Sequence, residues 1–280
     1  MLDATVATEP APGHASEDYH LVAARWALVL DGASRDPASE VGCHHDVPWF
    51  VARLGSYLGA AIATAGPETP LTEALAAAIR RTATDHEDSC DLTHPLTPGA
   101  TVAAVRASPD RIDWLVLGDA TAAWQTTTGD TESITDNRLD QLEGGPIVVT
   151  DVRRYRADYV ARVRNRPGGF WVAAADPVAA QQALTGSIPA RDVTTVGLFT
   201  DGVTRLVERY GWTWPQVFTV AREGGPRALI DVVRKAEHGD PDPTRWRGKP
   251  HDDATAVIGR VIHFGSDPTA GSSHHRGSAG

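Results

Sequence analysis

The sequence predicts an α+β protein in which antiparallel sheets pack face to face and helices cover their outer faces. Two observations lead to this prediction. Residues 100–130 contain short apolar segments separated by turn residues, which is typical of antiparallel strands. Helical patterns lie between the early and the late strands, and consecutive strand–helix–strand units are missing, which argues against a doubly wound parallel sheet.

In the first half of the chain, each expected element follows from its apolar spacing. Alternation of apolar residues predicts an edge strand at 4–8, and the apolar run at 26–30 predicts a buried strand. Helical spacing predicts helices at 49–64 and 71–85, and Gly66-Pro67 ends the first of them. Residues 100–107 and 112–117 form the expected hairpin, and a short strand follows through Trp124.

In the second half, glycine, proline and charged residues separate the expected elements. We expect the following elements, in chain order: a basic helix at 151–166, a strand at 170–173, a short helix at 177–184, a strand at 193–201, helices at 214–221 and 227–236, and a strand at 254–262. No linker divides the sequence, so the prediction is one domain over 1–264. The Gly/Ser-rich segment 265–280 is expected to be a disordered C-terminal tail.

Composition limits the classes of partner. The chain has 280 residues, of which 41% are hydrophobic and 22% charged, so it can build a sizeable core. The net charge of −10 argues against nucleic acid and anionic membranes as general partners. No apolar stretch approaches membrane-spanning length, and the first residues carry no basic region. These features, with only two cysteines, lead us to expect a soluble, cytoplasmic protein.

Acidic residues stand at the ends of several expected strands. Asp31 follows the apolar run at 26–30, and Asp201 ends the expected strand at 193–201, where an apolar run again leads into Asp-Gly. Asp252 immediately precedes the last strand, and Glu17 and Asp18 lie before an early one. A rigid strand end holds a carboxylate at a fixed place. A set of such oxygens is the ligand type that Mg²⁺ or Mn²⁺ requires, and this predicts a metal site.

Six short stretches then appear in the order found in one enzyme family. They are 16–18 (SED), 30–32 (LDG), 99–101 (GAT), 117–120 (LGDA), 199–203 (FTDGV) and 252–255 (DDAT). With this order the chain resembles the metal-dependent serine/threonine protein phosphatases of the PPM type, also called type 2C, as a divergent bacterial-type member. The resemblance implies a four-layer αββα sandwich, two antiparallel sheets flanked by helices, with two Mn²⁺ or Mg²⁺ ions at one end.

The resemblance also assigns metal ligands. By that likeness Asp31 would bridge both ions, and the Gly32 carbonyl with Glu17 would complete one site. Asp201 and Asp252 would hold the other ion. Asp31, Asp201 and Asp252 are therefore the expected catalytic residues, since two ions activate a water and stabilise charge on phosphate.

Other positions either support the ligands or depart from the family pattern. Asp18 and Asp119 would orient ligands and metal-bound waters. The family's phosphate-gripping arginine, four residues before the glutamate, is replaced by Gly13. The histidine that eukaryotic members carry after the first Asp-Gly is replaced by Ala33, and the residue before Glu-Asp is Ser16.

Phosphate binding therefore needs another residue. The candidates are His14, beside the missing arginine, and Arg162, Arg164 and Arg166 in the basic segment 153–166. The planar guanidinium group suits phosphate oxygens, so this segment could form a phosphate clamp. The alternative is a solvated helix face that pairs with the surplus acid.

The spacing of the cysteines and of the histidine run matches no known motif. Cys43 and Cys90 form no CxxC and are interpreted as packing thiols. The run His44-His45-Asp46 is interpreted as a solvated loop rather than a metal or proton-transfer site.

Together these features predict a Mn²⁺- or Mg²⁺-dependent phosphomonoesterase. The expected partner is a protein phosphorylated on serine or threonine. Two alternatives stay open from sequence: a catalytically silent phosphatase fold that binds a regulatory partner, and a phosphatase of a small phosphorylated metabolite.

Overall fold

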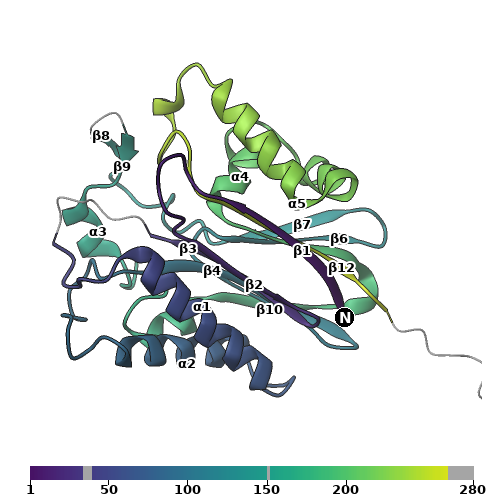
Figure 1. Cartoon of the computed structure of the whole chain (residues 1–280), viewed down its shortest axis with the longest axis horizontal. Coiled ribbons are helices and arrows are strands. Elements are labelled where there is room, and N and C mark those ends of the chain that lie inside the picture. The colour runs from purple at the N-terminus through teal and green to yellow at the C-terminus, as the bar shows by residue number, and fades with distance from the viewer. Residues whose placement is uncertain (34–39, 150–151, 264–280) are drawn as a thin grey trace, which may run out of the picture.

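Two five-stranded antiparallel sheets lie face to face and helices cover both outer faces, as Figure 1 shows. The computed structural model describes residues 1–33, 40–149 and 152–263. This architecture confirms the predicted α+β class and the αββα arrangement. The predicted tail at 265–280 lies outside the described residues, and the single domain over 1–264 stays a prediction.

The first sheet has the strand order β10-β5-β4-β3-β2 and the second has the order β1-β12-β11-β6-β7. All of their neighbouring strands pair antiparallel. The strands of the first sheet are β2 (Asp18–Ala23), β3 (Trp26–Gly32), β4 (Ala100–Ala107), β5 (Arg111–Leu117) and β10 (Leu184–Pro189). Those of the second are β1 (Leu2–Glu9), β6 (Thr121–Thr126), β7 (Thr131–Thr135), β11 (Val193–Phe199) and β12 (Ala254–Val261).

Helices α1 (Val47–Thr64) and α2 (Leu71–Thr84) cover the first sheet, while α4 (Asp201–Glu208) and α5 (Trp214–His238) cover the second (Figure 1). Helix α5 is broken at Gly225, because a φ of 72° is incompatible with a right-handed helix. Pro226 follows directly. Its halves correspond to the two helices expected at 214–221 and 227–236. Short 3₁₀ turns occupy Pro177–Gln182, Ala190–Asp192 and Pro243–Arg245.

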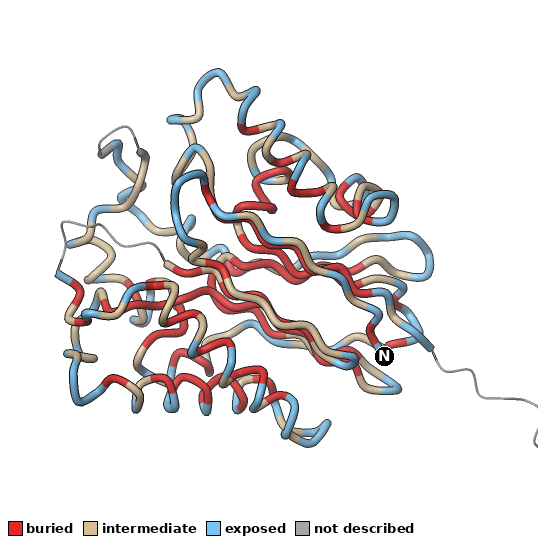
Figure 2. The backbone as a smooth tube through the Cα atoms, viewed as in Figure 1, coloured by how far each residue is buried: buried red, intermediate tan, exposed pale blue. Residues whose placement is uncertain are grey.

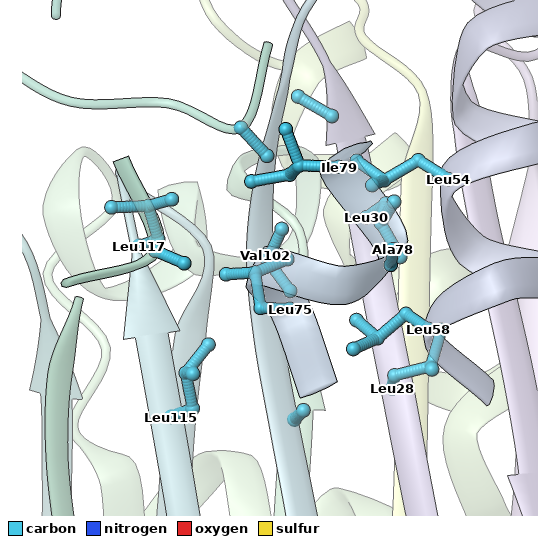
Figure 3. Packing of buried hydrophobic residues seen from close by; sticks show 14 of the residues in the cluster. Leu28, Leu30, Leu54, Leu58, Leu75, Ala78, Ile79, Val102, Leu115 and Leu117 are labelled. Carbon is cyan, nitrogen blue, oxygen red and sulfur yellow. The ribbon is translucent and has the colours of Figure 1, made fainter. Parts of the chain in front are cut away.

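Strand β3 lies in the interior and is buried on both faces. Leu28 and Leu30 point to the helices α1 and α2, where they meet Leu54, Leu58 and Leu75 (Figure 3). Alternate residues of a strand point to opposite faces, so Ala27 and Val29 join the core between the two sheets. Figure 2 shows the resulting band of buried backbone through the central strands. The continuous apolar run that predicted this strand reflects that double burial.

The expected basic helix at 151–166 is wrong in extent. The structure has a strand β9 (Val152–Arg154), paired with β8 (Ile147–Val149), and then a short helix α3 (Ala157–Val163). Arg156 is extended, with φ −67° and ψ 144°, so no helix passes through it. Within its described residues α3 buries no side chain completely, so no packed apolar face supports a longer helix. Asp151 itself lies outside the described residues.

Two smaller expectations also differ from the structure. The strand expected at 170–173 is present only as isolated bridges at Phe170 and Ala173. Strand β10 was not expected, because it is a half-exposed edge strand without a regular apolar alternation. It pairs with β5, and its Gly186 leaves room for the ring of Trp114.

Glycines allow helix α1 to lie close to the first sheet. A Cβ atom at Gly55 would collide with the ring of Tyr19, and one at Gly59 would lie 2.7 Å from Leu21 Cδ1. Both glycines are buried in the middle of the helix. The distance between α1 and β2 is therefore set by the missing side chains.

We predict that Gly55→Ala lowers the melting temperature, although alanine is the better helix former. Overpacking costs about 1–3 kcal/mol, which exceeds the helix-propensity gain of about 1 kcal/mol. The control is Ala60→Gly, at an exposed position of the same helix, which should lose about 1 kcal/mol by propensity alone. A Gly55→Ala protein that melts at a higher temperature than the wild type would contradict the packing argument.

Candidate active site

Five carboxylates gather at one end of the sandwich, each where a strand begins or ends. Asp31 lies at the end of β3 and is paired in register with Asp18, the first residue of β2. Asp201 is the first residue of α4, directly after β11 and Thr200. Asp252 precedes β12, and Asp119 lies between β5 and β6. The strand ends predicted from sequence therefore converge.

Asp31 is the centre of this group. Its Oδ2 atom lies 3.4 Å from the backbone nitrogen of Asp201, which donates a hydrogen bond from the first turn of α4. Burial raises the pKa of Asp31 well above its usual range, and the charges of Asp201, Asp18, Asp119 and Asp252 raise it further. Such crowding of like charges is unfavourable unless protons or cations offset it. The arrangement thus favours a bound cation.

Asp18 joins the two sheets at this end. Its Oδ2 atom accepts a hydrogen bond at 2.6 Å from Thr255 Oγ1, in β12 of the second sheet, and one at 2.9 Å from Thr200 Oγ1, which lies between β11 and α4. Burial raises its pKa, and these two hydrogen bonds only partly oppose that rise. The Oδ1 atom is buried and has no hydrogen-bond partner among the described residues. An oxygen of this kind is suited to a metal ion or a metal-bound water.

The backbone around Glu17 is held tightly against Gly32. The amide of Gly32 donates to the carbonyl of Glu17 at 3.0 Å, and a Cβ at Gly32 would lie 2.7 Å from that same oxygen. Only glycine permits this approach. Asp253 fixes the other side, because its carboxylate accepts from the amides of Ala11 and Glu17 at 2.6 Å each. The backbone of Glu17 is therefore held next to Gly32, the residue that follows Asp31.

Asp252 sits between cations as well as acids. Arg205, which is fully buried, donates to its Oδ2 atom at 3.1 Å, and Lys249 Nζ lies 3.7 Å from its Oδ1 atom. Lys249 also lies 3.6 Å from Glu17 Oε2. Burial and then Asp201 raise the pKa of Asp252 to about 7, against the opposing effect of Arg205 and Lys249.

Asp119 is paired with an arginine that sequence reasoning missed. Arg247 Nη2 lies 3.2 Å from Asp119 Oδ2, and its Nε lies 3.4 Å from Asp140. Arg247 and Lys249 both come from the loop just before Asp252, for which the sequence analysis proposed no functional residue. Two basic residues within five positions of an expected metal ligand were the available signal. Arg205 lies one turn into the helix that begins at Asp201.

The structure separates the four candidate phosphate-binding residues. His14, Arg162 and Arg166 are exposed, and Arg162 pairs with Asp158 at 3.3 Å along α3. Arg164 is instead buried against Gly99, and its Nη2 atom has no hydrogen-bond partner among the described residues. Burial lowers its pKa to about 10. The interpretation as a solvated helix face therefore fits Arg162 and Arg166 but does not fit the buried Arg164.

Arg164 also lies near the end of β3. The carbonyl of Gly99 accepts a hydrogen bond from the amide of Ala33 at 2.9 Å, and Ala100 pairs with Gly32. The chain that carries Asp31 thus runs directly past the residue against which the guanidinium packs. No other candidate for phosphate binding from the sequence has this position in the described part of the chain.

The carboxylates are more widely spaced than the ligands of a closed single-ion site. In residues 1–33, 40–149 and 152–263, one group of three or more possible ligand residues has all its ligand atoms within 4.8 Å, and it lies elsewhere, at Cys43, His45, His86 and Cys90. Ligands shared between two ions about 3.5–4 Å apart need not all touch one another. The acidic set, with its buried Asp18 oxygen and with Asp31 at its centre, fits a two-ion centre.

Comparisons with known proteins agree with this geometry. The family model described as protein phosphatase 2C matches residues 12–233. The comparison with curated proteins found no relative of this chain. No helix in the described residues is long and apolar enough to cross a membrane.

Several solved structures share the fold. The serine/threonine phosphatase PstP/Ppp of Mycobacterium tuberculosis has 16% identity and a TM-score of 0.60, over 94% of this chain and 99% of that one. Stp1 of Staphylococcus aureus has 12% identity and a TM-score of 0.58, over 94% and 96%. MsPP of Mycobacterium smegmatis, in complex with cacodylate, has 18% identity and a TM-score of 0.55, over 93% and 98%. With the family model covering most of the chain, this protein belongs to the protein phosphatase 2C family, whose members are hydrolases that act on phosphoric monoesters.

Proposed function

We propose that this chain is a Mn²⁺- or Mg²⁺-dependent phosphatase of phosphoserine and phosphothreonine in proteins. The observation that supports it most is the burial of Asp31 among four further aspartates at one end of the sandwich. Family membership supplies the reaction class. A solved PstP structure is described as a complex with two manganese ions; it has 17% identity and a TM-score of 0.55 to this chain, over 93% of this chain and 98% of that one. A cytoplasmic location stays part of the proposal.

The residues that would hold the ions are those predicted from sequence. Asp31 would be shared, with Glu17 and the Gly32 carbonyl on one side and Asp201 and Asp252 on the other. Two ions so held would lower the pKa of a water and stabilise charge on the phosphate during in-line displacement. Asp18 would orient ligands and waters through its free Oδ1 atom while its Oδ2 atom stays bound to the second sheet. Asp119, which is paired with Arg247, would also orient ligands and waters.

Arg164 would bind the substrate phosphate. A guanidinium group that is buried, and whose Nη2 atom has no partner in the described structure, leaves a donor available for an anion. The exposed Arg162 and Arg166 are less suited, because solvent and salt weaken contacts made at the surface. Lys249 is the second cation near the acids, although it is already engaged with Glu17 and Asp252.

Replacing the shared ligand should abolish activity. We predict that Asp31→Ala loses at least about a hundredfold in Mn²⁺-dependent turnover of an aryl phosphate and of a phosphopeptide, because stabilisation of transition-state charge is lost. Asp3→Ala, at an exposed acid of the edge strand β1, is the matched control and should stay active. A folded Asp31→Ala protein with wild-type turnover would refute the two-ion assignment. If the wild-type protein binds metal but turns over no substrate, the result would favour a catalytically silent binding module.

The metal-free protein should lose stability as the pH rises. An aspartate in an unfolded chain has a pKa near 3.9, whereas burial and Asp201 raise that of Asp252 to about 7. Between these two values the folded state holds the proton more tightly than the unfolded state does, so the free energy of unfolding falls with pH and levels off above pH 8. We expect the melting temperature in chelator to be a few degrees lower at pH 8 than at pH 5, roughly in line with small-domain scaling.

Asp252→Asn tests the source of that pH dependence. The neutral side chain should flatten the curve and make the metal-free protein more heat-stable at pH 8, since a like charge is removed. The rise in melting temperature on adding Mn²⁺ should shrink, because a ligand is lost. Unchanged curves, both with and without Mn²⁺, would show that Asp252 is not in the cluster.

Substrate binding should depend on Arg164 and not on its exposed neighbour. We predict that Arg164→Gln raises KM on the order of tenfold with little change in kcat, because one charge-assisted contact is worth roughly 1.5–3 kcal/mol. Arg162→Gln, a substitution within the short helix α3, is the control and should leave KM unchanged. Melting curves of both variants check that folding is intact. An unchanged KM for Arg164→Gln at low salt would assign phosphate binding elsewhere.

A further inference from the structure

Two cysteines and two histidines far apart in sequence meet outside the acidic site. Cys43 and His45 precede helix α1, while His86 and Cys90 follow helix α2. One ligand atom from each lies within 4.8 Å of all the others. We propose that these four side chains bind one Zn²⁺ ion in a closed tetrahedral site that joins the two helix ends.

The distances between ligand atoms fit this assignment. Cys43 Sγ lies 3.6 Å from His45 Nδ1 and 3.4 Å from His86 Nδ1, and Cys90 Sγ lies 3.5 Å from His45 Nδ1. Zinc bonds of about 2.3 Å to sulfur and 2.0–2.1 Å to nitrogen give sulfur–nitrogen edges of about 3.6 Å in a tetrahedron. The two sulfur atoms are 2.9 Å apart and would separate by about 1 Å around the ion.

The backbone brings the two halves of the site together without any ion. The amide of Asp91 donates to the carbonyl of Gly42 at 2.7 Å, beside Cys43 and Cys90. Gly42 has a φ of +69°, and a Cβ there would lie 2.7 Å from the Asp91 carbonyl oxygen, so the two segments touch. The amide of Cys90 donates to the carbonyl of His86 at 3.0 Å, which is a helical turn that points both side chains to the same side.

The surroundings suit a structural ion. Cys43 and His86 are buried, and the ring of Trp49 stacks on His45 at 3.8 Å and meets His86 edge-on at 5.1 Å. The Nε2 atom of His86 has no hydrogen-bond partner among the described residues, and its Nδ1 atom contacts the thiol of Cys43.

The donor types distinguish this site from the acidic one. Two sulfurs and two nitrogens favour zinc, whereas carboxylate oxygens favour Mg²⁺ or Mn²⁺. A disulfide between the cysteines would leave two imidazoles converging on the sulfurs without a reason, and the structure has no such bond. The proposal gives Cys43 and Cys90 a role other than packing thiols, and it takes His45 out of the loop that was interpreted as solvated. The fourth ligand, His86, was not singled out in the sequence.

A zinc ion here would also bear on the acidic site. The chain leaves β3 at Asp31 and Gly32 and reaches Cys43 before α1 begins at Val47. The ion would fix the far end of that connection to the end of α2. A side chain of Val47 also packs against Gly32, where a Cβ would collide with it. The site would therefore hold the start of α1, whose Val47 contacts Gly32, against the end of α2.

The experiment uses the full chain, reduced and freed of metal, with Mn²⁺ in excess to fill the acidic site. Zinc is added and the reactivity of thiols with a chromogenic disulfide is measured. The chain has two cysteines in all, so the thiol count reports on this site alone. We expect one Zn²⁺ per chain and protection of both thiols. In parallel, Co²⁺ should give a thiolate charge-transfer band and the visible bands of tetrahedral cobalt.

Variants identify the ligands. Cys43→Ser with Cys90→Ser should lose the cobalt bands and weaken zinc binding at least about a hundredfold, since even the partners of ligands contribute 10–100-fold. His45→Ala should also weaken zinc binding, while His44→Ala, whose Nδ1 lies 3.5 Å from Cys90 Sγ but outside the group, should not. Equal losses for His44→Ala and His45→Ala would overturn the ligand set. Wild-type thiols that stay reactive in excess zinc, or that are found as a disulfide after purification under reducing conditions, would overturn the site itself.

Discussion

The repulsion among buried carboxylates is the constraint on which this structure depends. Asp31, Asp18 and Asp201 lie together at one end of the sandwich, where burial and neighbouring carboxylates raise the pKa of Asp31 and Asp18. The fold offsets part of this charge with its own cations. Arg205 is fully buried and contacts both Asp252 and Glu237, with an Nη1–Glu237 distance of 2.5 Å. The rest of the charge is left for metal ions, which is why the proposed chemistry and the stability of this end are linked.

The two sheets deliver these carboxylates because their strands end at the same place. Strand β3 is apolar on both faces and therefore fixed by packing on each side, so the acid at its end has little freedom. Asp18 accepts hydrogen bonds from Thr255 of the opposite sheet and from Thr200 just after β11, and Gly202 lies so close to Asp253 that no side chain would fit. Small residues and threonines, rather than charged ones, thus set the spacing of the site.

The cations around the site come from three separate parts of the chain, and each has a different task. Arg205 supports Asp252 from within helix α4, and Arg247 supports Asp119 from the loop before β12. Arg164 packs against Gly99 instead, and burial lowers its pKa to about 10. An arginine that pairs with a carboxylate is already occupied, whereas Arg164 has no such pairing in the described part of the chain and is therefore the one proposed to bind phosphate. That difference is invisible in composition, where all three count alike.

The sequence by itself determined the strands that are buried on both faces, the helices with a long apolar stripe, and the acids at strand ends. These depend on local periodicity and on residue order. Tertiary structure decided the limits of the basic segment, because α3 has little core to pack against and its ends depend on distant contacts. It likewise decided that Arg164 is buried while Arg162 is exposed, since two residues of sequence separation say nothing about depth. It also brought Cys43 to Cys90, because a site built from two helix ends has no short motif.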